Sequence, residues 1–130
     1  MPSYKLYKMI HFAGIAMVVM AIAGVSFHAW LGGDKAAAGG PRKLLLAAHG
    51  VGMFLILLGG MGAGTAMGAI SSEAGFAAWI HPKLGLWAVV AALPALPYRS
   101  PKLGAAMFVL LPVLVALAAW IAGGFQPLTR

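Results

Sequence analysis

Long apolar blocks separated by short polar segments make up the chain, and the blocks lack the residue-by-residue alternation of half-buried β-strands. They cover about residues 6–31, 43–70, 77–96 and 102–122. Since a bilayer-spanning helix needs about 20 apolar residues, each block predicts one transmembrane helix. The connections GGDKAAAGGPR, SSEAG and PYRSP are typical of turns, and short connections make successive helices antiparallel neighbours. We therefore predict an all-α integral membrane protein, with residues 1–130 forming one up-down-up-down bundle of four transmembrane helices.

The composition favours the same class of protein. Of 130 residues, 62% are hydrophobic and 8% are charged, and the mean hydropathy is +0.95. The net charge of +7 comes from basic residues at the edges of the apolar blocks, where they act as topology signals and contact lipid headgroups. We expect the lipid bilayer as partner, that of a bacterial inner membrane, a homo-oligomer or larger membrane complex, and no nucleic acid.

The distribution of Lys and Arg between the two ends predicts the orientation. One end would carry three basic residues, or four if Lys83 is counted there, and the other five: Lys5, Lys8 and Arg130 against Lys35, Arg42, Lys43, Arg99 and Lys102. By the positive-inside rule, both termini are expected outside the cytoplasm.

Glycines repeat every four residues in the second block. Gly60, Gly64 and Gly68 would form one stripe of a helix, which allows close approach of another backbone or of a flat ligand. Packing between helices is the simpler interpretation of such a stripe.

Five ionisable side chains lie within or at the ends of the apolar blocks, where a charge is costly and indicates function: His11, His28, His49, His81 and Lys83. At about 1.5 Å per residue, His11 lies roughly 8 Å inside the first helix and His28 about 26 Å further along. His81 enters the third helix from the His11 side, and His49 lies towards the His28 side. The sequence thus predicts two depths in the bundle, one towards each end, at which pairs of these side chains lie.

At the first level, His11 faces His81 or Lys83 across the centre of the bundle, because helices one and three are diagonal partners. Two nitrogens from facing helices, surrounded by apolar side chains, are how a b-type haem is held in membrane bundles. His81 and Lys83 are about 200° apart on a regular helix, so only one of them can point inward. Pro82 fits best as the first helical residue, which would leave His81 at the helix mouth.

At the second level, His49 and Met107 lie at similar depth on diagonal helices and could ligate another haem, although methionine is more often a packing residue. His28 is expected at the interface beside Trp30, or with His49 in a small-metal or haem-edge role.

Other chemistries find little support. There are no cysteines, and the only acids, Asp34 and Glu73, lie in loops on opposite sides, so a closed zinc site lacks ligands. Ser71 and Ser72 are expected to cap the third helix, with Glu73 in its first turn, and they do not form a hydrolytic triad.

Three stretches resemble the small membrane proteins of the SirB type and, more distantly, HemJ-type protoporphyrinogen oxidases and the CopD membrane domain: YKLYKMIHFAGIAMVV, LLAAHGVGMFLILLGG and WIHPKLGLWAVVAALPALPYR. The resemblance implies a four-helix bundle and, for the HemJ relatives, haem b bound by a histidine of helix one and a lysine of helix three, here His11 and Lys83. GVSFHAW stands where HemJ proteins have an arginine-rich end of helix one.

The expected function is therefore a haem b-binding integral membrane protein in electron transfer or HemJ-like porphyrinogen oxidation. The cofactor ligands would be His11 with His81 or Lys83, and His49 with Met107 at a second site. Two alternatives remain: a non-catalytic accessory or assembly subunit, and a copper-related membrane protein.

Overall fold

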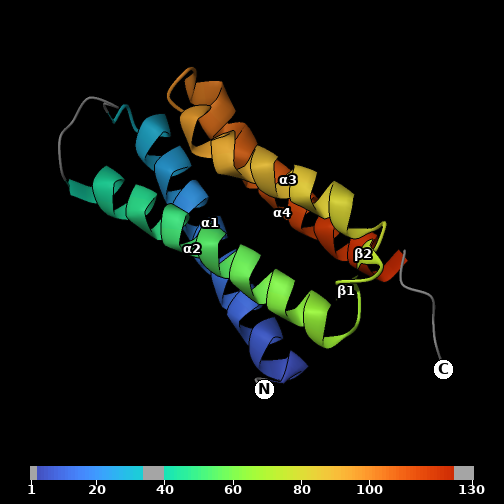
Figure 1. Cartoon of the computed structure of the whole chain (residues 1–130). Helices are drawn as coiled ribbons and strands as arrows, with labels where there is room; N and C mark the ends of the chain where they lie inside the picture. The colour runs from blue at the N-terminus through green and yellow to red at the C-terminus, as the bar shows by residue number, and fades with distance from the viewer. Residues whose placement is uncertain (1–2, 34–39, 125–130) are drawn as a thin grey trace.

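Four α-helices make up most of the chain in a computed structural model that describes residues 3–33 and 40–124. They are α1 (Tyr4–Trp30), α2 (Gly40–Ala66), α3 (Ile80–Ala92) and α4 (Pro101–Gly124). A short hairpin of β1 (Ile70–Ser71) and β2 (Gly75–Phe76) follows α2, and the 3₁₀ helix η1 (Leu93–Ala95) extends α3. Successive helices run in opposite directions (Figure 1). The all-α prediction is confirmed.

Helices α1 and α2 pack along their length because glycines let their backbones touch. A Cβ atom on Gly14 would lie 2.7 Å from the main-chain nitrogen of Ile56, and one on Gly52 would lie 3.0 Å from the main-chain oxygen of Gly14. Gly59 lies directly against the backbone of His11. Such close approach is the packing mode expected of small residues in apolar helices.

The predicted stripe of Gly60, Gly64 and Gly68 is only partly correct. Gly68 lies beyond the end of α2 and has a φ of +78°, a turn conformation that favours glycine. Gly60 and Gly64 contact side chains rather than the α1 backbone. The close contact with α1 uses Gly52 and Gly59, which lie seven residues apart on another stripe.

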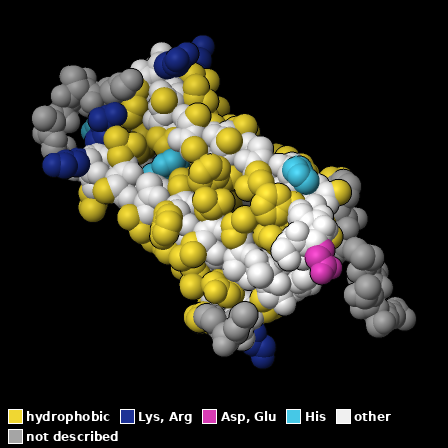
Figure 2. Space-filling view, viewed as in Figure 1, with side chains coloured by type: hydrophobic (Ala, Val, Ile, Leu, Met, Phe, Trp, Pro, Cys, Tyr) yellow, Lys and Arg dark blue, Asp and Glu magenta, His cyan; other side chains and the backbone are white. Residues whose placement is uncertain are grey.

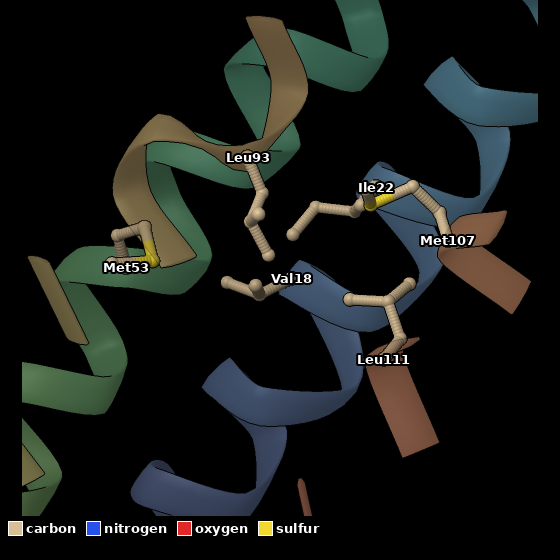
Figure 3. Close-up of a cluster of buried hydrophobic side chains, with 6 residues drawn as sticks. All are labelled: Val18, Ile22, Met53, Leu93, Met107 and Leu111. Atoms are coloured by element: carbon tan, nitrogen blue, oxygen red, sulfur yellow. The ribbon is translucent and has the colours of Figure 1, made fainter. Parts of the chain in front are cut away.

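The buried core lies where all four helices meet, towards the C-terminal end of α1. Figure 3 shows side chains from α1, α2, η1 and α4 converging there: Val18, Ile22, Met53, Leu93, Met107 and Leu111. Ile22 is completely buried. These contacts join the α1–α2 pair to the α3–α4 pair.

The outer surface is apolar along the helices and charged at the ends. In Figure 2, hydrophobic side chains cover the middle of the visible face, whereas Lys and Arg lie at its extremities. Three helices, α1, α2 and residues 102–122 of α4, are long and apolar enough to cross a membrane, and residues 80–95 form a shorter apolar helix. An exposed apolar surface of this extent marks contact with lipid or with other protein.

The segment between α2 and α3 differs from the prediction. The second helix was expected to reach Ile70 but ends at Ala66, and Ile70 pairs with Phe76 in the hairpin. The Ser71 hydroxyl accepts a hydrogen bond of 2.9 Å from the Ala74 N–H within the hairpin turn. Ser71 and Ser72 therefore do not cap the third helix, and Glu73 lies in the turn rather than in a first helical turn.

Helix α3 is shorter than the predicted block 77–96. It begins at Ile80, so Pro82 is its third residue and not its first, and His81 is already helical. Proline is tolerated there because the first N–H groups of a helix have no intrahelical acceptor. The α-helix ends at Ala92, and Pro94 lies in the 3₁₀ turn that follows.

Candidate functional site

A cavity of about 500 Å³ lies between the four helices, on the side of the core nearer the N-terminus of α1. This volume is within the range of small-molecule and cofactor sites, about 300–1,000 Å³. Most of its wall is aliphatic or aromatic carbon. The wall residues with nitrogen or oxygen in the side chain are Tyr4, Lys8, His11, Trp79, Lys83 and Trp87. A few polar groups in an apolar enclosure are the usual composition of a ligand site.

His11, the eighth residue of α1, is oriented by a main-chain contact to α2. Its Nδ1 lies 2.8 Å from the main-chain oxygen of Ile56. A carbonyl oxygen can only accept, so Nδ1 carries the proton and donates. In the neutral ring, Nε2 therefore carries a free lone pair. His11 lines the cavity, so this nitrogen is available as a ligand there.

Gly60 gives the His11 ring its space. A Cβ atom at Gly60 would lie 3.3 Å from both Cε1 and Nδ1 of His11. Gly60 also lines the cavity. Sequence reasoning placed this glycine in a packing stripe, and its contact with His11 was not anticipated.

Lys83 on α3 provides a second side-chain nitrogen in the cavity wall, besides that of His11. Its side chain is half-buried and lines the same cavity as His11. The Lys83 Nζ lies 5.7 Å from the centre of the Trp79 ring, a cation–π distance. Trp79 is the residue that precedes α3 and also lines the cavity.

His81 does not line this cavity. It is exposed, and its ring packs edge-on against Phe76 of β2, with 6.1 Å between ring centres. Two residues apart on one helix, His81 and Lys83 point to different sides, as predicted. The structure thus brings His11 together with Lys83 and not with His81.

His49 and Met107 lie outside the cavity wall. His49 is 7% exposed, and its Nε2 donates a hydrogen bond of 3.2 Å to the main-chain oxygen of Val90. The same oxygen also accepts a hydrogen bond from the Leu93 N–H at the end of α3, so His49 adds a second donor to it. Met107 is 2% exposed within the core cluster.

His28 has a partner that the sequence did not identify. Its Nδ1 lies 2.9 Å from the Tyr98 hydroxyl, and the Arg42 guanidinium lies 5.3 Å from the centre of the Tyr98 ring. These three residues come from α1, α2 and the segment between η1 and α4. The sequence does not reveal which distant residues meet, so this contact is visible only in the fold.

Within residues 3–33 and 40–124, no three or more His, Cys, Asp or Glu side chains are grouped so as to hold a metal ion. A site built entirely of protein ligands, such as zinc prefers, needs about four. A porphyrin supplies four nitrogens of its own and needs one or two from the protein. Of these two kinds of site, the pair His11 and Lys83 suits only the second.

The chain was compared with protein-family models, with curated proteins and with solved structures, and none of the three comparisons gave a match.

Proposed function

We propose that this protein is a bilayer-embedded four-helix bundle that binds one haem b between α1 and α3, where the nitrogens of His11 and Lys83 would hold it. The observation that carries the proposal is the hydrogen bond from His11 Nδ1–H to the Ile56 carbonyl. A histidine that ligates a metal almost always donates its other ring N–H to a carbonyl, carboxylate or water, which orients the ring and raises its basicity.

The composition of the cavity fits the proposal. Its wall takes residues from all four helices and is mainly apolar, as a porphyrin face requires. Gly60 and Gly64 lie in that wall and provide flat surface without side chains. Lysine ligates through its neutral amine, and a cavity of carbon atoms offers that amine few competing partners.

The membrane setting rests on the surface of the molecule. Large apolar side chains are exposed on all four helices, and basic residues lie at the ends. Residues 80–95 are too few for a full straight span of about 30 Å. The basic residues that follow, Arg99 and Lys102, can reach the interface by extending their side chains.

Electron transfer is the function that this site supports best. A haem held by His11 and Lys83 would supply one-electron chemistry there. The resemblance to HemJ-type proteins supports the ligand pair, whereas the GVSFHAW end of α1 lacks the arginines of those oxidases.

One set of spectra tests the proposal. Protein purified from haem-replete cells is expected to show a Soret band that shifts on reduction, and about one haem per chain by the pyridine hemochrome assay. His11→Ala and Lys83→Ala should each lower or shift that band. His81→Ala is the matched control, since its side chain is exposed and outside the cavity, and it should leave the spectrum unchanged.

A second measurement separates ligation from folding. In His11→Gly the ring is removed, and added imidazole should restore the original spectrum by occupying the vacated position. Absence of haem from the unmodified protein would refute the proposal and favour a non-catalytic accessory subunit. If His81→Ala changed the spectrum and Lys83→Ala did not, His81 would be the second ligand in place of Lys83.

A further inference from the structure

The central cavity is polar at one end and apolar at the other. Except for Trp87, its side chains with nitrogen or oxygen lie on the first half of α1 and around the start of α3: Tyr4, Lys8, His11, Trp79 and Lys83. The opposite end is lined by Val18, Val90 and Leu111. Val18 lies about 10 Å further along α1 than His11, and it belongs with Leu111 to the buried core.

Trp87 leaves no free donor at the apolar end. Its Nε1–H donates a hydrogen bond of 3.1 Å to the main-chain oxygen of Met53. An indole has a single N–H and no acceptor, so this bond uses its whole capacity. On the core side of Lys83, the described wall has no other side chain that forms strong hydrogen bonds. A ligand of this cavity must therefore turn its apolar part towards the core.

Lys8 lies at the polar end and is held beside the cavity by two aromatic rings. Its Nζ lies 5.5 Å from the centre of the Tyr4 ring and 5.8 Å from the centre of the Phe12 ring, both cation–π distances. Tyr4 and Phe12 line the cavity as Lys8 does, one helical turn before and after it on the same face of α1. The side chain of Lys8 is exposed, so its ammonium group can meet a ligand at the rim without first losing its water.

No carboxylate balances the lysines in the described part of the wall. It contains Lys8 and Lys83 but neither Asp nor Glu. A ligand with carboxylates at one end would supply that charge, since a hydrogen bond between an ammonium and a carboxylate is stronger than one between neutral groups. Lys8 lies about 4.5 Å nearer the end of the bundle than His11, so the charged end of such a ligand would face the aqueous side.

We infer that the central cavity selects a porphyrin by its carboxylates, which bind at Lys8 while the apolar edge of the ring lies against Val18 and Leu111. Lys8 is then the residue that determines specificity and orientation, and it is not an iron ligand. This inference rests on the proposed function for the class of ligand. It does not require ligation of the iron, so an iron-free porphyrin obeys it as well.

A titration with two iron-free porphyrins tests the inference. The protein is placed in phosphatidylcholine nanodiscs and titrated with protoporphyrin or with its dimethyl ester, in which both carboxylates are neutral. Quenching of tryptophan emission reports binding, because Trp79 and Trp87 line the cavity. We expect the original protein to bind the diacid roughly 3- to 10-fold more tightly than the ester. This preference should shrink as salt is added, since salt screens exposed charges.

Three substitutions show whether Lys8 is the cause. Lys8→Gln should bring the two affinities close together, and Lys8→Arg should keep the preference for the diacid. Lys5→Gln is the matched control, because Lys5 is exposed on the same turn of α1 but outside the cavity wall, and it should also keep the preference. Partition of each porphyrin into the bilayer is the same for every variant, so differences between variants report the protein site.

The outcomes separate this inference from haem ligation. Equal affinities for diacid and ester in the original protein would overturn the inference, as would the same preference in Lys8→Gln as in Lys5→Gln. Either result would leave a haem spectrum that depends on His11 in place. A preference that depends on Lys8, together with a haem spectrum unchanged by His11→Ala, would support the inference and refute ligation by His11.

Discussion

The ring of His11 on α1 is held by the main chain of α2, through a hydrogen bond of 2.8 Å from Nδ1 to the oxygen of Ile56. One helical turn further along α2, Gly60 leaves the space that the ring needs. The tight packing of α1 on α2 is therefore part of the candidate site, since it fixes both the hydrogen bond and the glycine. Some substitutions at this interface should therefore change ligand binding, and others should change the stability of the helix pair.

Substitution of Gly60 should weaken cofactor binding. In Gly60→Ala the new Cβ would lie 3.3 Å from the His11 ring, and in Gly60→Val the branched side chain would force the ring out of position. Because outer contacts of a metal ligand are worth about 10- to 100-fold in affinity, we expect a loss of that size for the larger variant in a haem titration. Gly50→Ala, at a position where nothing lies within 4 Å, should bind as the original protein does. Equal affinities for all three would show that the ring is not positioned by α2.

Substitution of Gly59 should destabilise the α1–α2 pair. A Cβ at Gly59 would overlap the backbone of His11 and Tyr7, and backbone cannot yield as a flexible side chain can. We expect Gly59→Ala to lower the free energy of unfolding by about 1–3 kcal/mol. Gly50→Ala should leave it unchanged or raise it by up to about 1 kcal/mol, since alanine is the better helix former. Thermal unfolding in detergent, followed by circular dichroism, measures both, and equal transition temperatures would contradict the packing argument.

His49 should serve stability rather than cofactor binding. Its Nε2–H donates to the Val90 carbonyl, beside the hydrogen bond that this oxygen accepts from the Leu93 N–H, and so ties α2 to the end of α3. We expect His49→Leu to cost about 0.5–1.5 kcal/mol of stability and to leave one haem per chain. Met107→Leu, a swap of similar volume in the core, should likewise keep the haem content. Two haems per chain in the original protein and one in His49→Leu would instead establish the second site that the sequence pattern indicated.

The helices were predictable because each depends on a local property, a long apolar run between turn residues. Tyr4–Trp30 was predicted as residues 6–31, for example. The hairpin was not predictable, because strands of two residues carry no period, and SSEAG is as typical of a helix cap as of a hairpin turn. The glycine contact was misassigned for a related reason. A period of four marks a stripe on one helix but does not say which stripe meets its neighbour.

For the candidate site, the sequence predicted His11 and left two alternatives, His81 and Lys83, for its partner. Depth along the helices placed His11 near both His81 and Lys83, and the start of α3 decides which of them lines the cavity. Pro82 suggested a later start than the one observed at Ile80. Main-chain acceptors were beyond sequence reasoning, because every residue has a carbonyl group. Only the fold shows that His11 contacts the carbonyl of Ile56 and that His49 contacts the carbonyl of Val90.

The orientation of the bundle in the membrane gives the last prediction. The chain has no cysteine, so single-cysteine variants report sidedness without background. Glu73→Cys lies in the hairpin turn at one end, and Lys43→Cys lies at the start of α2 at the other; both positions are exposed. The positive-inside rule, with five basic residues at the Lys43 end, places that end in the cytoplasm. A membrane-impermeant maleimide added to intact cells or spheroplasts should therefore label Glu73→Cys, and should label Lys43→Cys only after permeabilisation. The reverse pattern would invert the orientation, and labelling of both without permeabilisation would exclude a bundle that crosses the bilayer between these ends.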